Sequence, residues 1–413
     1  MIIIKKERGN FIVSSLSVKG LQISPSATLE ITSMAKKMRE SGINVISFGA
    51  GEPDFNTPNY IVEAAIKAMR EGNTRYTSVS GIPELKEAII HKFKKDNGIE
   101  YKQDEVMVAN GAKHILYNAI QAICNPGDEV IVLSPYWLSY PEMIKLADAI
   151  PVTVDTNEEE NFSIDLDRLE KSITKKTKAI IINSPNNPTG VVYPKEVLEK
   201  IADLALKYNI FIISDEIYEK LIYDDNIKHV SIASFGKEIK ELTITVNGVS
   251  KTYAMTGWRI GYCGANKNII SIMSNIQSHS TSNPNTIAQF ATLAALTQES
   301  HEINEMIEKF RERRNYMVKT LNTIKGITCN NPQGAFYVMV NINNFINKEI
   351  DEIKINGAKE FAKVLLEKAK VAVVPCESFG TEKFIRLSYA TSLENIVEGL
   401  NRIKFFIESS LEV

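Results

Sequence analysis

Short apolar runs alternate with helical patterns through the middle of the chain, and this alternation limits the fold more than any other feature. The runs are rich in valine and isoleucine, and the segments between them carry apolar residues three and four positions apart. Such alternation is typical of βαβ units, which assemble into parallel sheets. Because the runs are apolar at successive positions, we expect helices on both faces of the sheet. The predicted strands are residues 105–110, 128–135, 150–156, 178–185, 210–216 and 241–248, and the predicted helices include 111–123 and 194–209.

The last third of the chain has a different pattern, which predicts a second structural unit. Long amphipathic segments at 284–298 and 301–324 precede a mixture of short strand and helix patterns. We therefore predict an α/β fold with a large domain, residues 56–315, in which a mostly parallel sheet is sandwiched by helices. A smaller α+β domain is predicted from residues 1–55 with 316–413, and the start of the chain is expected to form an N-terminal arm.

Composition argues against several classes of function. Hydrophobic residues make up 44% of the 413 residues, and the formal net charge of −2 gives no reason to expect nucleic acid as a partner. No apolar run approaches the ~20 residues needed to cross a bilayer, and the first residues do not resemble a secretory signal. The four cysteines and five histidines show no ligand spacing, so neither disulfides nor a metal site is predicted. We expect a cytoplasmic protein that binds small molecules and no membrane.

Chemically unusual residues stand at the ends of three predicted strands. Asn187 follows one strand, Asp215 ends the next, and Lys251 follows a third. Ligands of open parallel sheets bind at the carboxyl ends of the strands, so an amide, a carboxylate and an amine are expected to converge there. Each residue alone has an ordinary alternative, as a turn residue, a helix start and a solvated lysine. Three of them at successive strand ends favour a shared site.

A phosphate site is predicted beside these residues. Gly111 begins a helix directly after a strand, and a helix start binds phosphate through its free N–H groups and its dipole. The turn matches neither common glycine-rich nucleotide motif, so this signal is weak alone. Arg259 adds a forked donor suited to a phosphate, and Ser250 adds a hydroxyl. Phosphate, carboxylate and amine sites together meet the needs of pyridoxal phosphate, which has an aldehyde, a ring nitrogen and a phosphate to be held.

Three segments resemble, in the same order, the cofactor segments of the fold-type I, class I aminotransferases. They are SPNNPTG at 184–190, SDEIYEKLIYD at 214–224 and NGVSKTYAMTGWRIGY at 247–262. The resemblance runs over most of the chain, and ISPSATLEITSMAKKM at 23–38 with AGEPDF at 50–55 is similar to bacterial aspartate aminotransferases within the family. It implies the fold of that family, pyridoxal phosphate as cofactor, and a homodimer.

The resemblance also implies a role for each matching residue. Lys251 would form the Schiff base with the cofactor, and Asp215 would pair with the ring nitrogen. The other implied cofactor contacts are Asn187 and Tyr218 at the phenolic oxygen, Trp137 on the ring face, and Gly111, Ala112, Lys113, Ser250 and Arg259 at the phosphate. Trp137 has the alternative of a core aromatic. Tyr76 resembles the tyrosine that reaches the phosphate of the neighbouring subunit, which would make the two active sites of a homodimer shared.

On the substrate side, Arg386 is an arginine among apolar neighbours, and its fork matches a carboxylate in two parallel bonds. A surface ion pair is the alternative. The resemblance implies that Arg386 clamps the α-carboxylate of an amino acid, with Asn187 and Trp137 beside the substrate, while Gly51 lets the backbone approach it closely.

Some residues depart from the family pattern. Ser24 stands where several bacterial aspartate aminotransferases have a lysine linked to acidic or prephenate substrates, which weakens a prephenate assignment. Ser26 and Thr28 are candidate donors to the distal group of the substrate, with helix capping as the alternative. Cys376 replaces the usual glycine.

We therefore predict a pyridoxal-phosphate-dependent aminotransferase. It would work by a ping-pong reaction that moves the amino group of an L-amino acid, with aspartate the leading donor, to 2-oxoglutarate. An aromatic- or alanine-type aminotransferase, and a pyridoxal phosphate lyase on the same fold, are the alternatives. A regulatory protein built on this fold would need a DNA-binding module, and no basic block or helix-turn-helix pattern is evident.

Overall fold

The computed structural model describes residues 16–350 and 353–411, and its centre is a seven-stranded sheet. The strand order is β2-β8-β7-β6-β5-β3-β4, and only β8 runs antiparallel to its neighbours. The strands are β2 (Val106–Ala109), β3 (Glu129–Ser134), β4 (Ile150–Asp155), β5 (Thr177–Asn183), β6 (Phe211–Asp215), β7 (Thr243–Gly248) and β8 (Gly261–Gly264).

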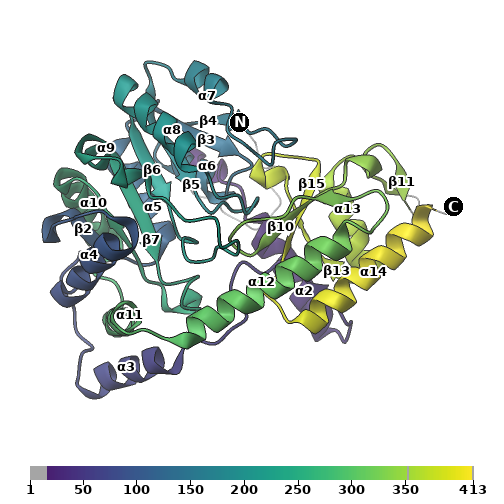
Figure 1. The fold of residues 1–413 in the computed structure, drawn as a ribbon, viewed down its shortest axis with the longest axis horizontal. Coiled ribbons are helices and arrows are strands. Elements are labelled where there is room, and N and C mark those ends of the chain that lie inside the picture. Colours follow the sequence, from purple (N-terminus) through teal and green to yellow (C-terminus); the bar gives the residue numbers. More distant parts are fainter. Residues whose placement is uncertain (1–15, 351–352, 412–413) are drawn as a thin grey trace, which may run out of the picture.

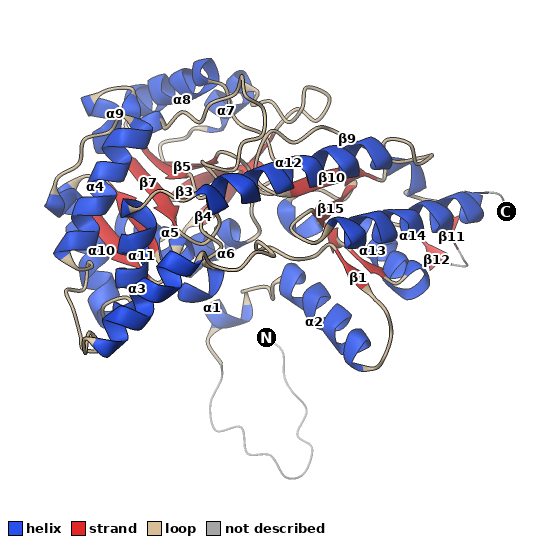
Figure 2. Cartoon of the chain, turned by 60° about the horizontal axis from the view of Figure 1, so that its bottom comes forward, coloured by secondary structure: helices blue, strands red, loops and turns tan. Residues whose placement is uncertain are grey.

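Helices cover both faces of this sheet, as its continuous apolar strands predict (Figure 2). In β3, Val130 and Val132 pack on one face, whereas Ile131 and Leu133 pack on the other. The helices of the first face are α5 (Ala112–Ile123), α6 (Ser139–Leu146) and α10 (Lys267–Ser280), and those of the second are α7 (Leu166–Ser172), α8 (Lys195–Tyr208) and α9 (Lys237–Leu242). A further cluster beside β2 contains α3 (Asn59–Arg70), α4 (Pro83–Asn97) and α11 (Thr286–Thr297).

A smaller sheet lies beside the large one (Figure 1), in the order β14-β15-β10-β9. A separate strand pair joins β1 to β13, so a segment before the large sheet pairs with one after it. The strands are β1 (Ile46–Ser47), β9 (Thr328–Cys329), β10 (Tyr337–Asn341), β13 (Val371–Ala372), β14 (Val374–Pro375) and β15 (Phe384–Ser388), with a short hairpin of β11 (Glu349–Ile350) and β12 (Ile353–Lys354). The helices near them are α2 (Ala27–Glu40), α12 (His301–Leu321), α13 (Ala358–Val364) and α14 (Leu393–Leu411), and α1 (Val18–Leu21) precedes α2.

The long helix α12 connects the two regions (Figure 1). It begins four residues after α11, beside the large sheet, and its apolar side packs into the core of the smaller one. The predicted domain boundary at 315/316 falls inside this helix, and the two domain ranges stay a prediction. The N-terminal arm predicted for the start of the chain lies outside the described residues.

The predicted elements of the large sheet agree with the structure to within two residues. Each predicted strand of the large sheet matches an observed strand to within two residues at both ends, and helices α5 and α8 match to within one. The antiparallel strand β8 was not predicted, because its short run follows the glycines and polar residues of the Lys251 segment.

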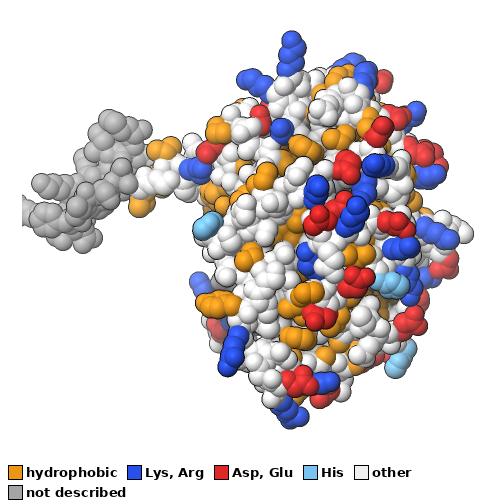
Figure 3. Space-filling view, turned by 90° about the vertical axis from the view of Figure 1, so that its left-hand side faces the viewer, with side chains coloured by type: hydrophobic (Ala, Val, Ile, Leu, Met, Phe, Trp, Pro, Cys, Tyr) orange, Lys and Arg blue, Asp and Glu red, His pale blue; other side chains and the backbone are white. Residues whose placement is uncertain are grey.

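Two surface properties bear on the expected partners. None of the helices in the described residues is both long and apolar enough to span a bilayer. On the face shown in Figure 3, basic and acidic side chains are interspersed rather than separated by sign.

Candidate active site

A cavity of about 460 Å³ opens at the carboxyl ends of β5, β6 and β7. These three strands are direct neighbours, so Asn187, Asp215 and Lys251 reach the same space from successive strand ends. Arg386 enters from β15 of the smaller sheet, and Gly51 from the segment after β1. The convergence predicted from the sequence is therefore found. The other predicted site residues in its wall are Ala112, Lys113, Trp137, Tyr218, Ser250 and Arg259.

The amine of Lys251 donates a 2.5 Å hydrogen bond to the carbonyl oxygen of Gly51. Burial lowers the pKa of Lys251 to about 8, and the charges of Arg259 and Arg386 act in the same direction. The carboxylates of Glu52 and Asp215 oppose this shift in pKa only in part. An amine with such a pKa has a substantial neutral fraction near pH 7, which a nucleophile or a general base requires.

The carboxylate of Asp215 lies at the end of β6 and is almost inaccessible to solvent. Its Oδ2 accepts a 2.7 Å hydrogen bond from the hydroxyl of Tyr140, and its Oδ1 accepts a bond from the backbone N–H of Ile217. Burial raises the pKa of Asp215 to about 6, although these hydrogen bonds act to lower it. A buried carboxylate with a raised pKa is a ready partner for a cation, because a nearby positive charge would restore its ionised form.

Arg386 is buried, and its guanidinium is only partly satisfied. Its Nη1 donates a 3.0 Å hydrogen bond to Oδ1 of Asn187, while Nε and Nη2 have no partner among the described residues. The aromatic rings of Tyr337 and Phe379 lie 4.2 and 5.0 Å from the guanidinium carbon. Buried donors are nearly always paired, so the two free nitrogens of Arg386 indicate a site for an anion with two oxygens, such as a carboxylate.

Asn187 and Tyr218 are held in place by their neighbours. The backbone N–H of Asn187 donates a 2.7 Å hydrogen bond to Oδ1 of Asn183, the last residue of β5. The hydroxyl oxygens of Tyr218 and Tyr337 are 3.0 Å apart. Burial raises the pKa of Tyr218 well above its usual value, so its hydroxyl keeps its proton and can donate a hydrogen bond.

Two glycines allow close packing at the start of α5, where the phosphate site is predicted, although Gly111 itself is not in the wall of the cavity. Gly111 precedes the helix with φ of 89°, and a Cβ at this position would collide with the guanidinium of Arg259. A Cβ at Gly261 would collide with the backbone of Ala112. Arg259 itself has φ of 58°, and its Nη1 donates to the carbonyl oxygen of Thr256 across 2.8 Å. Its Nη2 donates to the carbonyl oxygen of Asn110 across 3.4 Å, so the guanidinium lies against the start of α5, and the phosphate contact stays a prediction.

Lys113 and Trp137 are neighbours in the cavity wall. The ammonium of Lys113 lies 4.8 Å from the centre of the indole ring, and the indole meets the ring of Tyr140 edge to face. Burial lowers the pKa of Lys113, and the charge of Arg259 adds to this shift. Trp137 is only partly buried, and its stacking on a ligand ring stays a prediction.

The remaining predicted residues differ in their placement. Tyr76 is 89% exposed and lies apart from the cavity of its own chain, so its predicted contact with a neighbouring subunit stays a prediction. Ser26 and Thr28 line the cavity, and the Oγ1 of Thr28 has no partner among the described residues. Ser24 lies on the surface and donates its N–H to Glu142. Cys376 has φ of −97°, a conformation open to any L-residue, so the loop does not need the usual glycine.

Sequence reasoning missed several residues of this cavity. Tyr140 lies three positions after Trp137, and its place in the same helix start could have suggested it. Tyr337 could not have been found in this way, because its contact with Tyr218 depends on how β10 lies relative to β6. Glu52 accepts a 2.7 Å hydrogen bond from Thr256, and it was not singled out although its segment resembles that of the family.

Comparisons with known proteins agree with this geometry. Residues 43–403 match the family described as aminotransferase class I and II. The chain is 49% identical over 386 residues to an aspartate aminotransferase of Bacillus sp. (strain YM-2), covering 94% of this chain and 97% of the relative. It is 47% identical over 388 residues to a probable aspartate/prephenate aminotransferase of Aquifex aeolicus (strain VF5), covering 94% of this chain and 97% of the relative.

A solved structure gives the same result for the fold. The aspartate aminotransferase from Thermus thermophilus with maleate is 43% identical to this chain, and the match covers 95% of this chain and 100% of that one. The TM-score of the two chains is 0.90. Since sequence and fold agree over nearly the whole length, the chain belongs to the class I and II aminotransferases and has their fold-type I architecture.

Proposed function

We propose that this aminotransferase uses pyridoxal 5'-phosphate to move the amino group of an L-amino acid, aspartate above others, to 2-oxoglutarate. One observation carries the proposal: Arg386, whose buried Nε and Nη2 have no partner among the described residues, lines the same cavity as Lys251 and Asp215. A carboxylate held by Arg386 would bring its α-amino group to this cavity.

The residues present fit the cofactor. Ala112, Ser250 and Arg259 line the cavity at a helix start that suits a phosphate, with Gly111 packed beside Arg259, and the carboxylate of Asp215 suits a ring cation. When bound, pyridoxal phosphate supplies an aldehyde for an amine and a ring that withdraws electrons from the substrate. In this role Asn187 and Tyr218 offer hydrogen bonds from one side of the cavity, and Trp137 offers a flat apolar face.

The chain's own residues would divide the remaining work. Arg386 fixes the α-carboxylate in two parallel bonds, which orients the Cα–H bond of the amino acid. The pKa of Lys251 is lowered, so its neutral amine would take the proton from Cα of the amino acid and hold it as an ammonium. The buried walls of the cavity would limit access of bulk water to the proton transfer, and one water molecule would supply the oxygen of the released 2-oxo acid. The product is a 2-oxo acid, and a second 2-oxo acid then takes the amino group in the reverse order, a ping-pong reaction.

The charge of the cavity favours a substrate with two carboxylates. Lys113, Lys251, Arg259 and Arg386 line it, against the carboxylates of Asp215 and Glu52. If Arg259 holds the phosphate, Arg386 holds the α-carboxylate and Lys251 reacts, the ammonium of Lys113 is left for a distal carboxylate. The N–H of Lys113 lies in the first turn of α5 and remains able to serve the phosphate, as predicted.

Two further points support a dicarboxylate. The hydroxyls of Ser26 and Thr28 lie in the wall of the same cavity, and that of Thr28 is unpaired within the described residues. Relatives carry the names aspartate and aspartate/prephenate aminotransferase, and the Thermus thermophilus structure contains maleate, itself a dicarboxylate. We also propose that the active protein is a homodimer with shared sites, because Tyr76 is 89% exposed in the single chain and resembles the tyrosine that reaches the phosphate of the neighbouring subunit.

The test follows the visible absorption of the purified protein while single amino acids are added. We expect a cofactor band that aspartate and glutamate change at the lowest concentrations, and that 2-oxoglutarate restores. Alanine, tyrosine and phenylalanine serve as the competing donors, and prephenate as an alternative acceptor. Release of ammonia without restoration by any 2-oxo acid would identify a lyase instead, and the absence of a band on adding pyridoxal phosphate would refute the proposal.

A further inference from the structure

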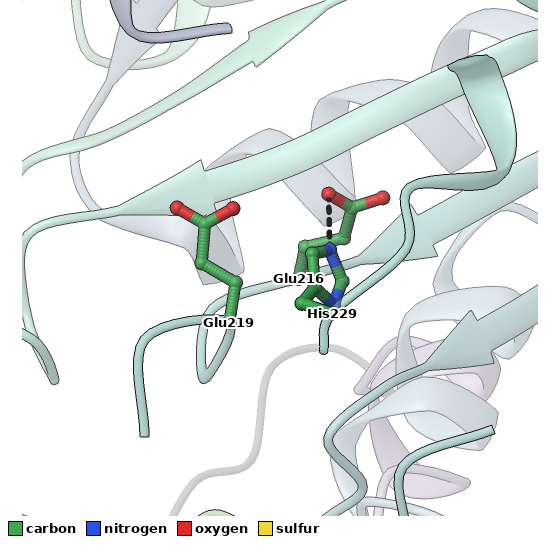
Figure 4. Close-up of side chains that lie close together, drawn as sticks. All are labelled: Glu216, Glu219 and His229. Atoms are coloured by element: carbon green, nitrogen blue, oxygen red, sulfur yellow. Dashed lines mark hydrogen bonds and ion pairs between the residues drawn. The ribbon is translucent and has the colours of Figure 1, made fainter. Parts of the chain in front are cut away.

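The segment from Asp215 to Glu219 faces two ways. Asp215 and Tyr218 line the cavity, whereas Glu216 and Glu219 are buried outside its wall and lie near His229 (Figure 4). The backbone N–H of Glu219 donates to the carbonyl oxygen of Glu216, which closes a tight turn. The same five residues therefore carry two cavity groups and two buried carboxylates.

The carboxylate of Glu216 is held by three partners. Its Oε1 accepts hydrogen bonds of 2.9 Å from Ser214 and 2.6 Å from Ser231, and its Oε2 lies 3.0 Å from Nε2 of His229. Ser231 and His229 belong to the loop that follows this segment. Glu216 thus ties the end of β6 to a stretch of chain more than ten residues further on.

The carboxylate of Glu219 is tied to a different element. It forms an ion pair with Lys92 of α4 and accepts a 2.9 Å hydrogen bond from Nδ2 of Asn97 at the end of that helix. Lys92 also bonds to Oδ1 of Asn97, and Asp96 lies 4.0 Å from Lys92 and 3.0 Å from Lys220.

The charges of this cluster balance when His229 carries a proton. The carboxylates of Glu216 and Glu219 then face one ammonium and one imidazolium, while Asp96 pairs with Lys220. Burial acts to lower the pKa of His229, but the charge and hydrogen bond of Glu216, with the charge of Glu219, hold that pKa above its usual value. Burial also acts to raise the pKa of Glu219, yet Lys92 and His229 bring it down to about 2.

The side chains of Glu216, Glu219 and His229 could be taken for a metal site, since their ligand atoms lie within 4.8 Å of one another. The contacts argue against this. Each carboxylate oxygen of Glu216 and Glu219 already has a partner, and the ammonium of Lys92 supplies a cation. The two carboxylates are therefore satisfied without an ion, whereas the buried Nδ1 of His229 has no partner among the described residues.

A buried charge cluster rarely stabilises a protein more than apolar side chains of the same volume would, but it can enforce one conformation. Here the enforced segment carries the ring-nitrogen partner and one of the hydroxyls of the proposed cofactor site. We propose that Glu216 and His229, with Glu219 and Lys92, are positioning residues that fix Asp215 and Tyr218 for the cofactor. This inference rests on the proposed function, because it takes pyridoxal phosphate as the ligand of those two residues.

The test compares the pyridoxal phosphate affinity of three variants, measured by titrating the cofactor into the cofactor-free protein. In His229→Gln the carboxylate of Glu216 loses its cation, so we expect roughly tenfold weaker binding, equal to about 1.4 kcal/mol. In Glu216→Gln, His229 can give up its proton and still bond to the amide, so we expect a change of less than about threefold. The double variant Glu216→Gln/His229→Gln remakes an uncharged hydrogen bond and should recover affinity to within the same range.

A matched control separates positioning from loss of stability. Glu105 is also buried, pairs with Lys240 across 2.9 Å, and lies at the other end of β2 from the cavity. Glu105→Gln should lower the melting temperature without changing cofactor affinity. Equal affinity in all variants, no recovery in the double variant, or equal weakening by Glu105→Gln would each overturn the inference.

Two further measurements keep the test decisive. If His229→Gln does not fold, Ser231→Ala removes one hydrogen bond from Glu216, and binding about threefold weaker is expected, whereas unchanged binding counts against the inference. The wild-type protein is titrated first. If it does not bind pyridoxal phosphate, the proposed function itself fails, whereas binding by the wild type with no difference among the variants removes only the positioning role.

Discussion

Arg386 and Asn187 lie side by side in the cavity, joined by a 3.0 Å hydrogen bond from Nη1 to Oδ1, although they are 199 positions apart in the sequence. The bond leaves Nε and Nη2 of Arg386 without partners in the described part of the chain. Asn187 thus holds the guanidinium by one corner, and the other two nitrogens are left for the proposed carboxylate.

Arg386→Lys tests this carboxylate anchor. A lysine keeps the charge but cannot form two parallel bonds, so kcat/KM should fall about 100-fold for every amino acid, equal to about 2.7 kcal/mol. Arg314→Lys is the matched control, because Arg314 is equally buried but binds Asp224 outside the cavity. It should lower stability with little change in kcat/KM. Near-normal turnover in Arg386→Lys would show that the anchor lies elsewhere.

Lys113→Gln tests the second carboxylate. Loss of a charged hydrogen bond costs about 1.5–3 kcal/mol, so kcat/KM for aspartate should fall roughly tenfold to a hundredfold, while that for alanine changes little. Lys178→Gln, which replaces a lysine lying over the ring of Phe211, is the control. An equal loss for aspartate and alanine would instead assign Lys113 to the phosphate alone.

Asp215→Asn should stabilise the cofactor-free protein. The pKa of Asp215 rises from 3.8 to about 6 on folding. At neutral pH the carboxyl group is ionised in both states, but its ionisation costs more free energy in the folded protein, which lowers the free energy of unfolding. The penalty is absent below pH 3.8 and complete above pH 6, where it reaches about 3 kcal/mol. Urea unfolding of the two proteins should therefore differ at pH 7 and converge near pH 4. If Asp215→Asn were no more stable than the wild type at pH 7, this account would be contradicted. We also expect Asp215→Asn to bind the cofactor more weakly than the wild type.

The rate of pyridoxal phosphate association should rise with pH. Only the neutral amine of Lys251 can attack an aldehyde, and its pKa is lowered to about 8. The rate should fall about tenfold per unit below pH 8 and level off above it, as stopped-flow absorbance can record. Arg386→Gln removes one of the cations that lower this pKa, so its midpoint should lie at higher pH. A midpoint shared by both proteins would mean that Arg386 does not act on Lys251.

Tyr76→Phe tests the shared site. Tyr76 is largely exposed in the single chain, so loss of its hydroxyl should leave the stability of the cofactor-free protein unchanged. A hydrogen bond to a phosphate of the neighbouring subunit is worth about 1.5–3 kcal/mol, so cofactor affinity should fall tenfold or more. Tyr208→Phe, which loses a surface bond to Glu170, is the control and should bind normally. Unaltered affinity in Tyr76→Phe would exclude the contact.

Much of this site could be predicted because the chemistry sits at strand ends. Asn187, Asp215 and Lys251 follow adjacent strands of a parallel sheet, so local patterns alone bring them together. Of the residues that enter from the smaller sheet, Arg386 was predicted as an arginine among apolar neighbours, whereas others left no such local signal. Tyr337 is one of these, because its position follows from the pairing of β10 with β15.

The cluster behind the wall shows the same limit. In the sequence, the acidic residues of the segment with Glu216 and Glu219 are consistent with a helix start. The structure has no helix in this described segment. The structure instead has a turn there, and the partner His229 lies ten residues beyond it in a loop without periodic pattern. A buried ion pair across irregular chain has no sequence period and therefore escapes prediction.

The hydrogen bond from Lys251 to the carbonyl oxygen of Gly51 has a consequence for how the protein is assembled with its ligand. Gly51 belongs to the strip between β1 and α3, which leads out of the region that contains β13. A nitrogen that has condensed with an aldehyde keeps at most one N–H to donate, so cofactor binding and anchorage of the strip compete for one nitrogen. The coupling is reciprocal: an interaction that holds the strip against Lys251 must weaken cofactor binding, and cofactor binding must weaken the contact of the strip by the same free energy.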